Sequence, residues 1–242
     1  VLAGKTLHHR RTREDNAKSL ELLERAIELD PEFAHAHAWR ACVLGQAYIN
    51  GYVADPDATW RAMTAELDRA LALDDNDSDV HRILAAVNTT RNNLGQAVYH
   101  QDRAFALNPN DDLIVVQQGE ILTWLGRAEE GIAWIQKAMR LNPYHPERFW
   151  SHLGRAYFVA RRCSEAIEAY RHVTSPDASV LANIAACLAH AGEAAAAMEA
   201  AAKVLGADPG FTVTKFLATM HYGRAEDLER HREGLFKAGL PA

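Results

Sequence analysis

The sequence has few residues that break helices, little cysteine and no long block of positive charge. Its 242 residues include 8 prolines, 14 glycines and 3 cysteines. Runs of β-branched residues are scarce, whereas Ala, Leu, Glu and Arg are frequent, so the composition favours helices over strands. A chain of this length that is 48% hydrophobic can bury a continuous core. These counts predict an all-α protein.

Two classes of partner find no support in the sequence. No apolar run approaches the roughly 18 residues that a membrane-spanning helix requires, and Lys5 with two histidines interrupts any signal peptide. The formal net charge is −6, and no basic block exceeds the short cluster at residues 8–11. We therefore expect no membrane insertion by this segment, no nucleic acid partner and a cytoplasmic location.

The cysteines predict no disulfide framework. Cys42, Cys163 and Cys187 are odd in number and far apart in the sequence, so free thiols in a reducing cytosol are expected. The chain opens at Val1 in what reads as the middle of a helix. We therefore expect it to be a piece of a longer polypeptide.

The stretch at residues 150–170 has the most informative spacing of large and small residues. It follows the order W-x₂-L-G-x₂-Y…A-x₃-F, with tyrosine in the last place, through Trp150, Leu153, Gly154, Tyr157, Ala166 and Tyr170. This stretch resembles a tetratricopeptide repeat, in which large residues fill the seam between two antiparallel helices. One such unit cannot bury its apolar face alone, so the resemblance implies neighbours with the same spacing.

Turns that contain proline recur at the 34-residue length of a tetratricopeptide repeat. Pro109 and Pro143 are 143 − 109 = 34 residues apart, and both follow an asparagine at the end of an apolar run. We predict an all-α superhelix of antiparallel helix pairs, with first helices on the concave side, as one array over residues 1–242. Its expected units are 1–33 (truncated at the N-terminus), 34–77, 78–111, 112–145, 146–177 and 178–211, followed by capping helices over 212–242.

Several local features are expected within this array. Asp57 is expected to cap the helix of residues 58–73. The aspartates at 75–79 resemble the start of a calcium loop but lack its later glycine and glutamate, so we predict a polar turn in which Asp77 or Ser78 caps the next helix. Gly119 and Gly131 are predicted to lie where two helices touch.

The C-terminal third is expected to differ from the rest. Residues 178–211 are rich in alanine and bury little area per residue, so we predict a thinner and less stable part of the array. Final helices are predicted at 212–220 and 225–238. The second of these is expected to carry a polar outer face formed by Glu226, Glu229, Arg230 and Arg232.

No catalytic or metal-binding pattern stands out. His35 and His37 lie two residues apart on a helix and point about 200° apart, so they cannot share one ion. No His-x₃-His or Cys-x₂-Cys pair, nucleophile elbow or phosphate loop occurs. We expect no metal, no cofactor and no enzymatic activity in this chain.

The concave groove remains as the candidate site. Arginine beside a large aromatic residue suits an extended peptide, because the guanidinium binds carboxylates and the ring binds an apolar anchor. The alternative is that Trp124 and Phe158 simply pack between helices. The asparagines and lysines of the chaperone-binding clamp are missing. The predicted groove residues are His35, Asp79, Arg82, Thr89, Glu120, Trp124, Arg148, Ser151, Arg155 and Phe158.

Peripheral stretches carry a more specific resemblance. Residues 10–17, 23–31, 142–150 and 232–241 resemble the repeat region that follows the catalytic domain of bacterial class III adenylate/guanylate cyclases. The resemblance implies a non-catalytic module that binds a protein or peptide and regulates or localises an attached cyclase. Two alternatives stay open: a groove that senses a small molecule or peptide, and a module that forms homodimers through the alanine-rich end and the terminal helix.

Overall fold

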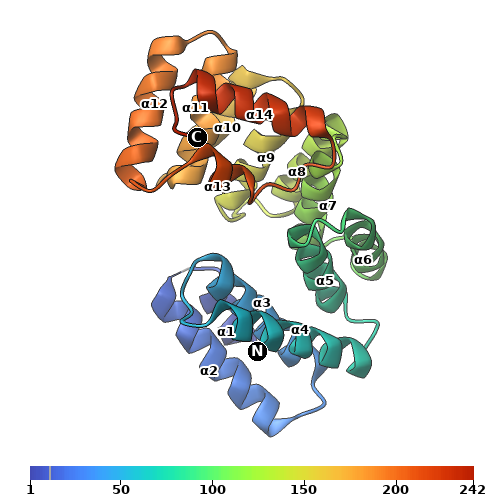
Figure 1. Cartoon of the computed structure of the whole chain (residues 1–242). Coiled ribbons are helices and arrows are strands. Elements are labelled where there is room, and N and C mark those ends of the chain that lie inside the picture. Colours follow the sequence, from blue (N-terminus) through green and yellow to red (C-terminus); the bar gives the residue numbers. More distant parts are fainter. Residues whose placement is uncertain (11) are drawn as a thin grey trace. The chain divides into compact units, whose positions relative to one another are not determined.

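The computed structural model describes residues 1–10 and 12–242, and all regular elements in these residues are α-helices (Figure 1). None of these helices is long and apolar enough to cross a lipid bilayer. The predicted all-α class is therefore confirmed for the described residues. The helices are α1 (Leu2–His8), α2 (Arg13–Leu29), α3 (Ala34–Ile49), α4 (Pro56–Leu73), α5 (Ser78–Thr90), α6 (Leu94–Leu107), α7 (Asp112–Trp124), α8 (Ala128–Leu141), α9 (Arg148–Val159), α10 (Cys163–Arg171), α11 (Ala178–His190), α12 (Ala194–Ala207), α13 (Val213–Leu217) and α14 (Ala225–Lys237).

The chain divides into two compact units. Unit 1 comprises Val1–Asn88 and Gly95–Pro109, and unit 2 comprises Thr89–Leu94 and Asn110–Ala242. In unit 1, α1 packs on α2 and α3 on α4. In unit 2 the packed pairs are α7 with α8, α9 with α10, and α11 with α12. One continuous array over residues 1–242, with the repeat boundaries expected above, stays a prediction.

Helix starts follow local capping chemistry. The Asp77 carboxylate accepts hydrogen bonds from the backbone N–H groups of Asp79 and Val80, at 2.7 and 3.3 Å, which confirms the predicted cap of α5. The prediction that Asp57 caps α4 is wrong: the Asp55 carboxylate accepts from the Ala58 N–H at 2.9 Å. Pro56 explains the shift, because its fixed φ and missing N–H suit the first helical position.

Helices α7 and α8 approach each other at two glycines. A Cβ atom on Gly119 would lie 2.6 Å from Ile135 Cγ1 and 2.7 Å from the Gly131 carbonyl oxygen. A Cβ on Gly131 would lie 2.5 Å from Thr123 Oγ1. The prediction that these glycines mark a helix contact is therefore confirmed.

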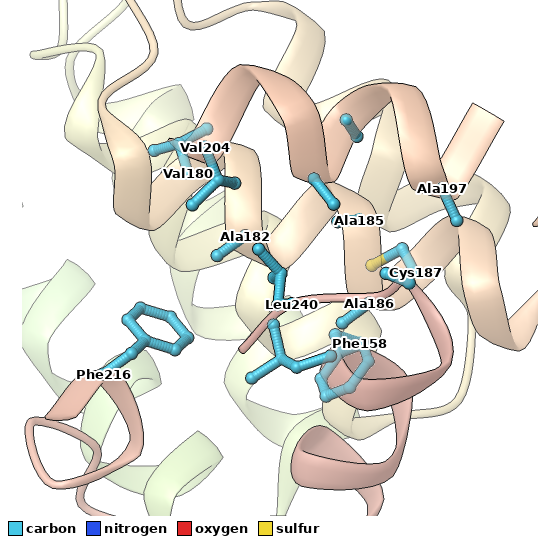
Figure 2. Packing of buried hydrophobic residues seen from close by; sticks show 14 of the residues in the cluster. Phe158, Val180, Ala182, Ala185, Ala186, Cys187, Ala197, Val204, Phe216 and Leu240 are labelled. Atoms are coloured by element: carbon cyan, nitrogen blue, oxygen red, sulfur yellow. The ribbon is translucent and has the colours of Figure 1, made fainter. Parts of the chain in front are cut away.

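The alanine-rich pair α11–α12 belongs to a large core cluster in unit 2 (Figure 2). Phe158 from α9 and the C-terminal residues Phe216, Leu235 and Leu240 pack against its alanines. Residues 178–211, which were expected to form a thinner part of the array, are therefore covered by larger side chains from other parts of the chain. Whether this part is less stable than the rest stays a prediction.

The C-terminal segment, residues 211–242, runs back over earlier helices of unit 2. The Gly223 N–H donates to the Trp124 carbonyl at 2.8 Å, and the Val213 N–H donates to the Pro241 carbonyl at 2.8 Å. Between these points α14 packs on α11, and a Cβ on Gly234 would lie 3.0 Å from the Ala186 carbonyl oxygen.

The predicted polar outer face of the terminal helix needs a correction. Glu226 and Glu229 are exposed, but Arg230 points inward. Its guanidinium lies 5.4 Å from the ring centroid of Phe158 and donates to Cys163 Sγ at 3.4 Å. The physical reason is that α14 lies against first helices of unit 2, so one side of it faces the protein.

Candidate functional site

Four of the predicted groove residues lie under the C-terminal segment in unit 2. Glu120 and Trp124 come from α7, and Arg155 and Phe158 from α9. Together with Ala186 and His190 of α11 they form a surface that we call the first-helix face of unit 2. Trp124 is 2% and Phe158 is 1% exposed. The first-helix face is therefore a buried internal interface.

Aromatic contacts hold the C-terminal segment on this face. The Trp124 ring meets Tyr222 edge to face at 5.0 Å between centroids and His221 at 5.5 Å. The Phe158 ring lies 4.9 Å from His231. Such pairs contribute about 0.5–1.5 kcal/mol each beyond their buried area, so the segment is anchored at two rings of the face.

Charged groups surround the same rings. The Arg155 guanidinium lies 4.6 Å from the Trp124 centroid, and its Nη1 lies 3.6 Å from Glu120 Oε1. His152 Nδ1 lies 3.3 Å from the same oxygen. Burial raises the pKa of Glu120, but electrostatic interaction and a hydrogen bond with His152, together with the electrostatic effects of Arg155 and His221, outweigh burial and lower this pKa to about 2. Glu120 is therefore an anion that holds Arg155 over the indole.

His231 is a neutral histidine at the centre of the interface. Burial, with the nearby charges of Arg155 and His190, lowers the pKa of His231 to about 3. Its Nδ1 and the Tyr222 hydroxyl are 3.0 Å apart. The uncharged imidazole suits a site lined by aromatic rings. If it were protonated, the guanidinium of Arg155 would repel its charge and little water could solvate it.

A clamp at the start of α14 fixes the segment beside the α7–α8 turn. Arg224 donates from Nε and Nη2 to the two carboxylate oxygens of Asp227, at 2.7 and 2.9 Å. Asp227 is 2% exposed. Gly126, with φ +79°, lies directly beneath Arg224, because a Cβ there would overlap the Arg224 Nε atom. A side chain at position 126 would push the clamp away.

The interface leaves some polar atoms without a protein partner. Trp124 Nε1, Arg155 Nε and His231 Nε2 are buried and make no hydrogen bond within the described residues. A buried polar group without a partner costs about 1–3 kcal/mol. The C-terminal segment therefore fills the face but does not match all of its polar groups.

The other predicted residues of α9 lie nearer its start. Arg148 and Ser151 are partly exposed, and the Arg148 guanidinium lies 5.8 Å from the Phe149 ring centroid. Peptide binding by any of the predicted groove residues stays a prediction.

In unit 1, two of the predicted residues, His35 and Arg82, lie beside the buried carboxylate of a third, Asp79. Asp79 Oδ1 accepts from Arg82 Nε at 3.0 Å, and His35 Nε2 lies 3.6 Å from Asp79 Oδ2. Asp79 Oδ2 also accepts from Lys5 Nζ at 3.1 Å and from Trp39 Nε1 at 2.9 Å. Burial raises the pKa of Asp79, but Arg82 and Lys5 dominate and lower it strongly. This anion is therefore fully paired.

Sequence reasoning missed three members of this cluster, Lys5, Trp39 and Asp77. Lys5 comes from α1, and Asp77, whose Oδ2 lies 2.7 Å from His35 Nδ1, was expected only as a cap. His35, Asp77 and Asp79 could each offer a ligand atom to a metal, within 4.8 Å of one another. Lys5 and Trp39 already donate to Asp79, so the cluster is satisfied as an ion-pair network. Thr89, predicted with these residues, is buried near the end of α5 and belongs to unit 2.

Known proteins show what this arrangement is similar to. A family model described as a bacterial transcriptional activator domain matches residues 92–182. No curated protein matches the sequence significantly. Among solved structures, PilW, a widely conserved type IV pilus biogenesis factor, superposes with a TM-score of 0.61 at 17% identity, over 82% of this chain and 88% of PilW.

Two further structures give the same result. A thermophilic TPR protein of Thermus thermophilus superposes with a TM-score of 0.57 at 17% identity, over 80% of this chain and 96% of its own. The APC/C heterotetramer Cut9–Hcn1 gives 0.66 at 18% identity, over 89% of this chain but only 39% of that chain. At such low identity the likeness shows the fold alone. The tetratricopeptide-type fold that the sequence predicts is thereby confirmed.

Proposed function

We propose that this chain is a non-catalytic scaffold that binds a protein or peptide partner on the first helices of its repeats. One observation carries the proposal: the first-helix face of unit 2 already binds a polypeptide, the chain's own C-terminal segment, through rings and charges. A surface that holds a helix of the same chain has the chemistry to hold a similar helix of another chain. The tetratricopeptide-type fold supports this assignment.

The contacts indicate the kind of partner that fits. A partner would reproduce the contacts of the C-terminal segment if a non-helical stretch placed an aromatic residue against Trp124 and a following amphipathic helix placed an uncharged ring against Phe158. A carboxylate or carbonyl that reaches Trp124 Nε1 or Arg155 Nε would add hydrogen bonds that the C-terminal segment does not make. Such a partner competes with residues 211–242 for the same face.

A synthetic peptide that copies part of the C-terminal segment tests the proposal directly. The probe is a fluorescent peptide of residues 219–242, titrated into the full chain and followed by anisotropy. Wild type is expected to bind weakly because its own segment occupies the face. A Tyr222→Ala variant of the chain loosens that segment and is expected to bind at least tenfold more tightly. Adding Arg155→Gln is expected to weaken binding again.

The matched control is the same peptide with alanine at positions 222 and 231. It lacks both ring anchors and is expected to bind to none of the variants. Equal binding of both peptides, or no binding to folded Tyr222→Ala protein, would rule out the proposed face. Circular dichroism of each variant separates loss of binding from loss of fold.

We also propose that the chain is the cytoplasmic regulatory or interaction module of a bacterial adenylate/guanylate cyclase. The support is the resemblance of residues 10–17, 23–31, 142–150 and 232–241 to the repeat region of those enzymes. The test is expression of the complete open reading frame and assay of cyclic nucleotide formation from ATP and GTP. A complete polypeptide that forms neither product removes the cyclase and leaves the scaffold proposal standing.

A second candidate function has its own observation. The family model of a bacterial transcriptional activator domain matches residues 92–182, which favours a regulator of transcription as the longer polypeptide. In that case the complete polypeptide shifts promoter DNA in a gel, and the present chain alone does not, since it has a net charge of −6 and no long basic block. Cyclic nucleotide formation without DNA binding would decide against this candidate.

A further inference from the structure

Two histidines from the neighbouring helices α5 and α6 (Figure 1) meet in unit 1. His81 of α5 is 3% exposed, and His100 of α6 is half-buried. Their Nδ1 atoms are 3.0 Å apart, and their ring centroids are 5.3 Å apart. Two imidazole nitrogens therefore face each other at a place that solvent reaches beside His100.

A backbone contact decides which nitrogen of His81 carries the proton. His81 Nε2 lies 2.9 Å from the Asp75 carbonyl oxygen, which can only accept a hydrogen bond. In the neutral ring Nε2 is therefore protonated, and the Nδ1 lone pair points at His100, which donates to it from its own Nδ1. Histidines that ligate metal ions are commonly held in this way, because the hydrogen bond from one ring nitrogen orients the other.

We propose that His81 and His100 bind a divalent transition-metal ion, such as Zn²⁺, through their two Nδ1 atoms, with water in the remaining coordination positions. Imidazole nitrogen is a preferred ligand of zinc, copper and nickel. The ion would join α5 to α6 within unit 1. This proposal does not depend on partner binding by the first-helix face of unit 2.

The distances suit one ion shared by the two rings. Two imidazole nitrogens that each bind a tetrahedral zinc ion at about 2.0–2.1 Å are about 3.3 Å apart, and their ring centroids are about 5 Å apart. The observed separations of 3.0 and 5.3 Å differ from these values by a few tenths of an ångström. The ion would lie beside the line that joins the two nitrogens, so the rings would tilt toward it while the helices keep their places.

The protonation of the pair also suits a cation. Burial, together with the electrostatic effect of His81, lowers the pKa of His100, so the His100 ring is neutral at neutral pH. When the ion binds, the Nδ1 proton of His100 moves through solvent to Nε2 of the same ring, and the freed lone pair binds the ion. Both Nδ1 lone pairs then face the metal without any net release of protons.

The spacing of histidines along the sequence could not reveal this pair. The expected absence of a metal site was based on missing His-x₃-His and Cys-x₂-Cys pairs, whereas these two residues are 19 places apart on two helices. The pair also differs from the cluster of His35 and Asp79. There the Lys5 ammonium and a guanidinium already lie beside the buried carboxylate, so a further cation would be repelled.

Isothermal titration calorimetry of the full chain with Zn²⁺ tests the site. We expect one saturable site with a dissociation constant in the micromolar range. His100→Ala is expected to weaken binding at least tenfold, because only one ring nitrogen of the pair remains. Absence of saturable binding at millimolar Zn²⁺, or unchanged binding by folded His100→Ala protein, overturns the proposal.

Three controls accompany the titration. His172→Gln removes an exposed histidine, and His35→Gln removes the histidine beside Asp77 and Asp79; both variants should bind Zn²⁺ like wild type. Mg²⁺ prefers oxygen ligands and should not bind at the histidine pair. Loss of Zn²⁺ binding in His35→Gln but not in His100→Ala protein would place the ion at the wrong cluster and refute the proposal.

Nitrogen NMR of the histidine rings identifies the ligating atoms. One equivalent of Zn²⁺ is expected to shift the Nδ1 resonances of His81 and His100 together, while Nε2 of His81 keeps the shift of a protonated nitrogen. Shifts at other histidines with these two unchanged would contradict the site. The measurement uses the wild-type protein, so misfolding of a variant does not protect the proposal.

Discussion

His231 is the residue where ionisation and folding oppose each other most strongly. Burial, with Arg155 and His190, lowers its pKa from 6.5 to about 3. A histidine whose pKa is lower in the folded state than in the unfolded state gives its full stability above pH 6.5, and loses it as the pH falls toward 3. His190 and His221 have lowered pKa values for the same first cause, burial, so they act in the same direction.

We predict that the free energy of unfolding falls by about 2 kcal/mol from His231 alone between pH 7.5 and pH 5. Urea unfolding at the two pH values measures this loss. His231→Gln removes the titrating group and should reduce the pH dependence by about that amount. The exposed His172→Gln is the control and should keep the wild-type dependence. An undiminished drop in the His231 variant would show that other groups cause it.

Side-chain partnerships of this kind could not be predicted from the sequence. Lys5 and Asp79 are 74 residues apart, and Arg230 and Cys163 are 67 apart. Nothing in the repeat spacing connects them, because the spacing describes contacts within a helix pair and between neighbours. By contrast, the cap by Asp77 depends on residues two and three places away, and the sequence predicts it.

At the scale of helix pairs, two glycines set the distance between α7 and α8. A methyl group at Gly119 would meet Ile135 and the Gly131 backbone at less than 3 Å, and backbone cannot move aside cheaply. We predict that Gly119→Ala destabilises unit 2 by about 1–3 kcal/mol, measured by urea unfolding.

Gly206→Ala is the matched control for that measurement. Gly206 lies in α12 with nothing within 4 Å of an added Cβ, so alanine there should be neutral or stabilise by up to about 1 kcal/mol. If the two substitutions had equal effects, α7 and α8 would not be in close contact.

At the scale of the whole chain, the repeat pattern predicts the helix pairs but not the path of residues 211–242. The positions of the small residues and of the Asn-Pro turns are properties of each pair, so they can be predicted from the spacing. The C-terminal segment has no repeat partner, and its contacts with Trp124 of α7, Phe158 of α9 and Ala186 of α11 join helices from three different pairs. The same segment explains why alanine-rich α11 has large neighbours.

We predict that loosening this segment affects unit 2 and leaves unit 1 unchanged. In Tyr222→Ala protein, amide hydrogen exchange in α7, α9 and α11 should accelerate by roughly tenfold or more, because the rings that cover them move away. Exchange in α2, α3 and α4 is expected to match wild type and is the internal reference. Uniform acceleration in both units would contradict the division into two compact units.

The hydrogen bond from Val213 to Pro241 joins the two ends of the C-terminal segment to each other, and the bond from Gly223 to Trp124 ties the middle of the segment to α7. Because its ends are held together, the segment has no free end that could leave the face first, so a competitor for the same face must wait until the closed segment detaches as a whole. The rate of exchange is then limited by the rate at which the C-terminal segment detaches. Above a certain competitor concentration, the binding rate should therefore stop rising.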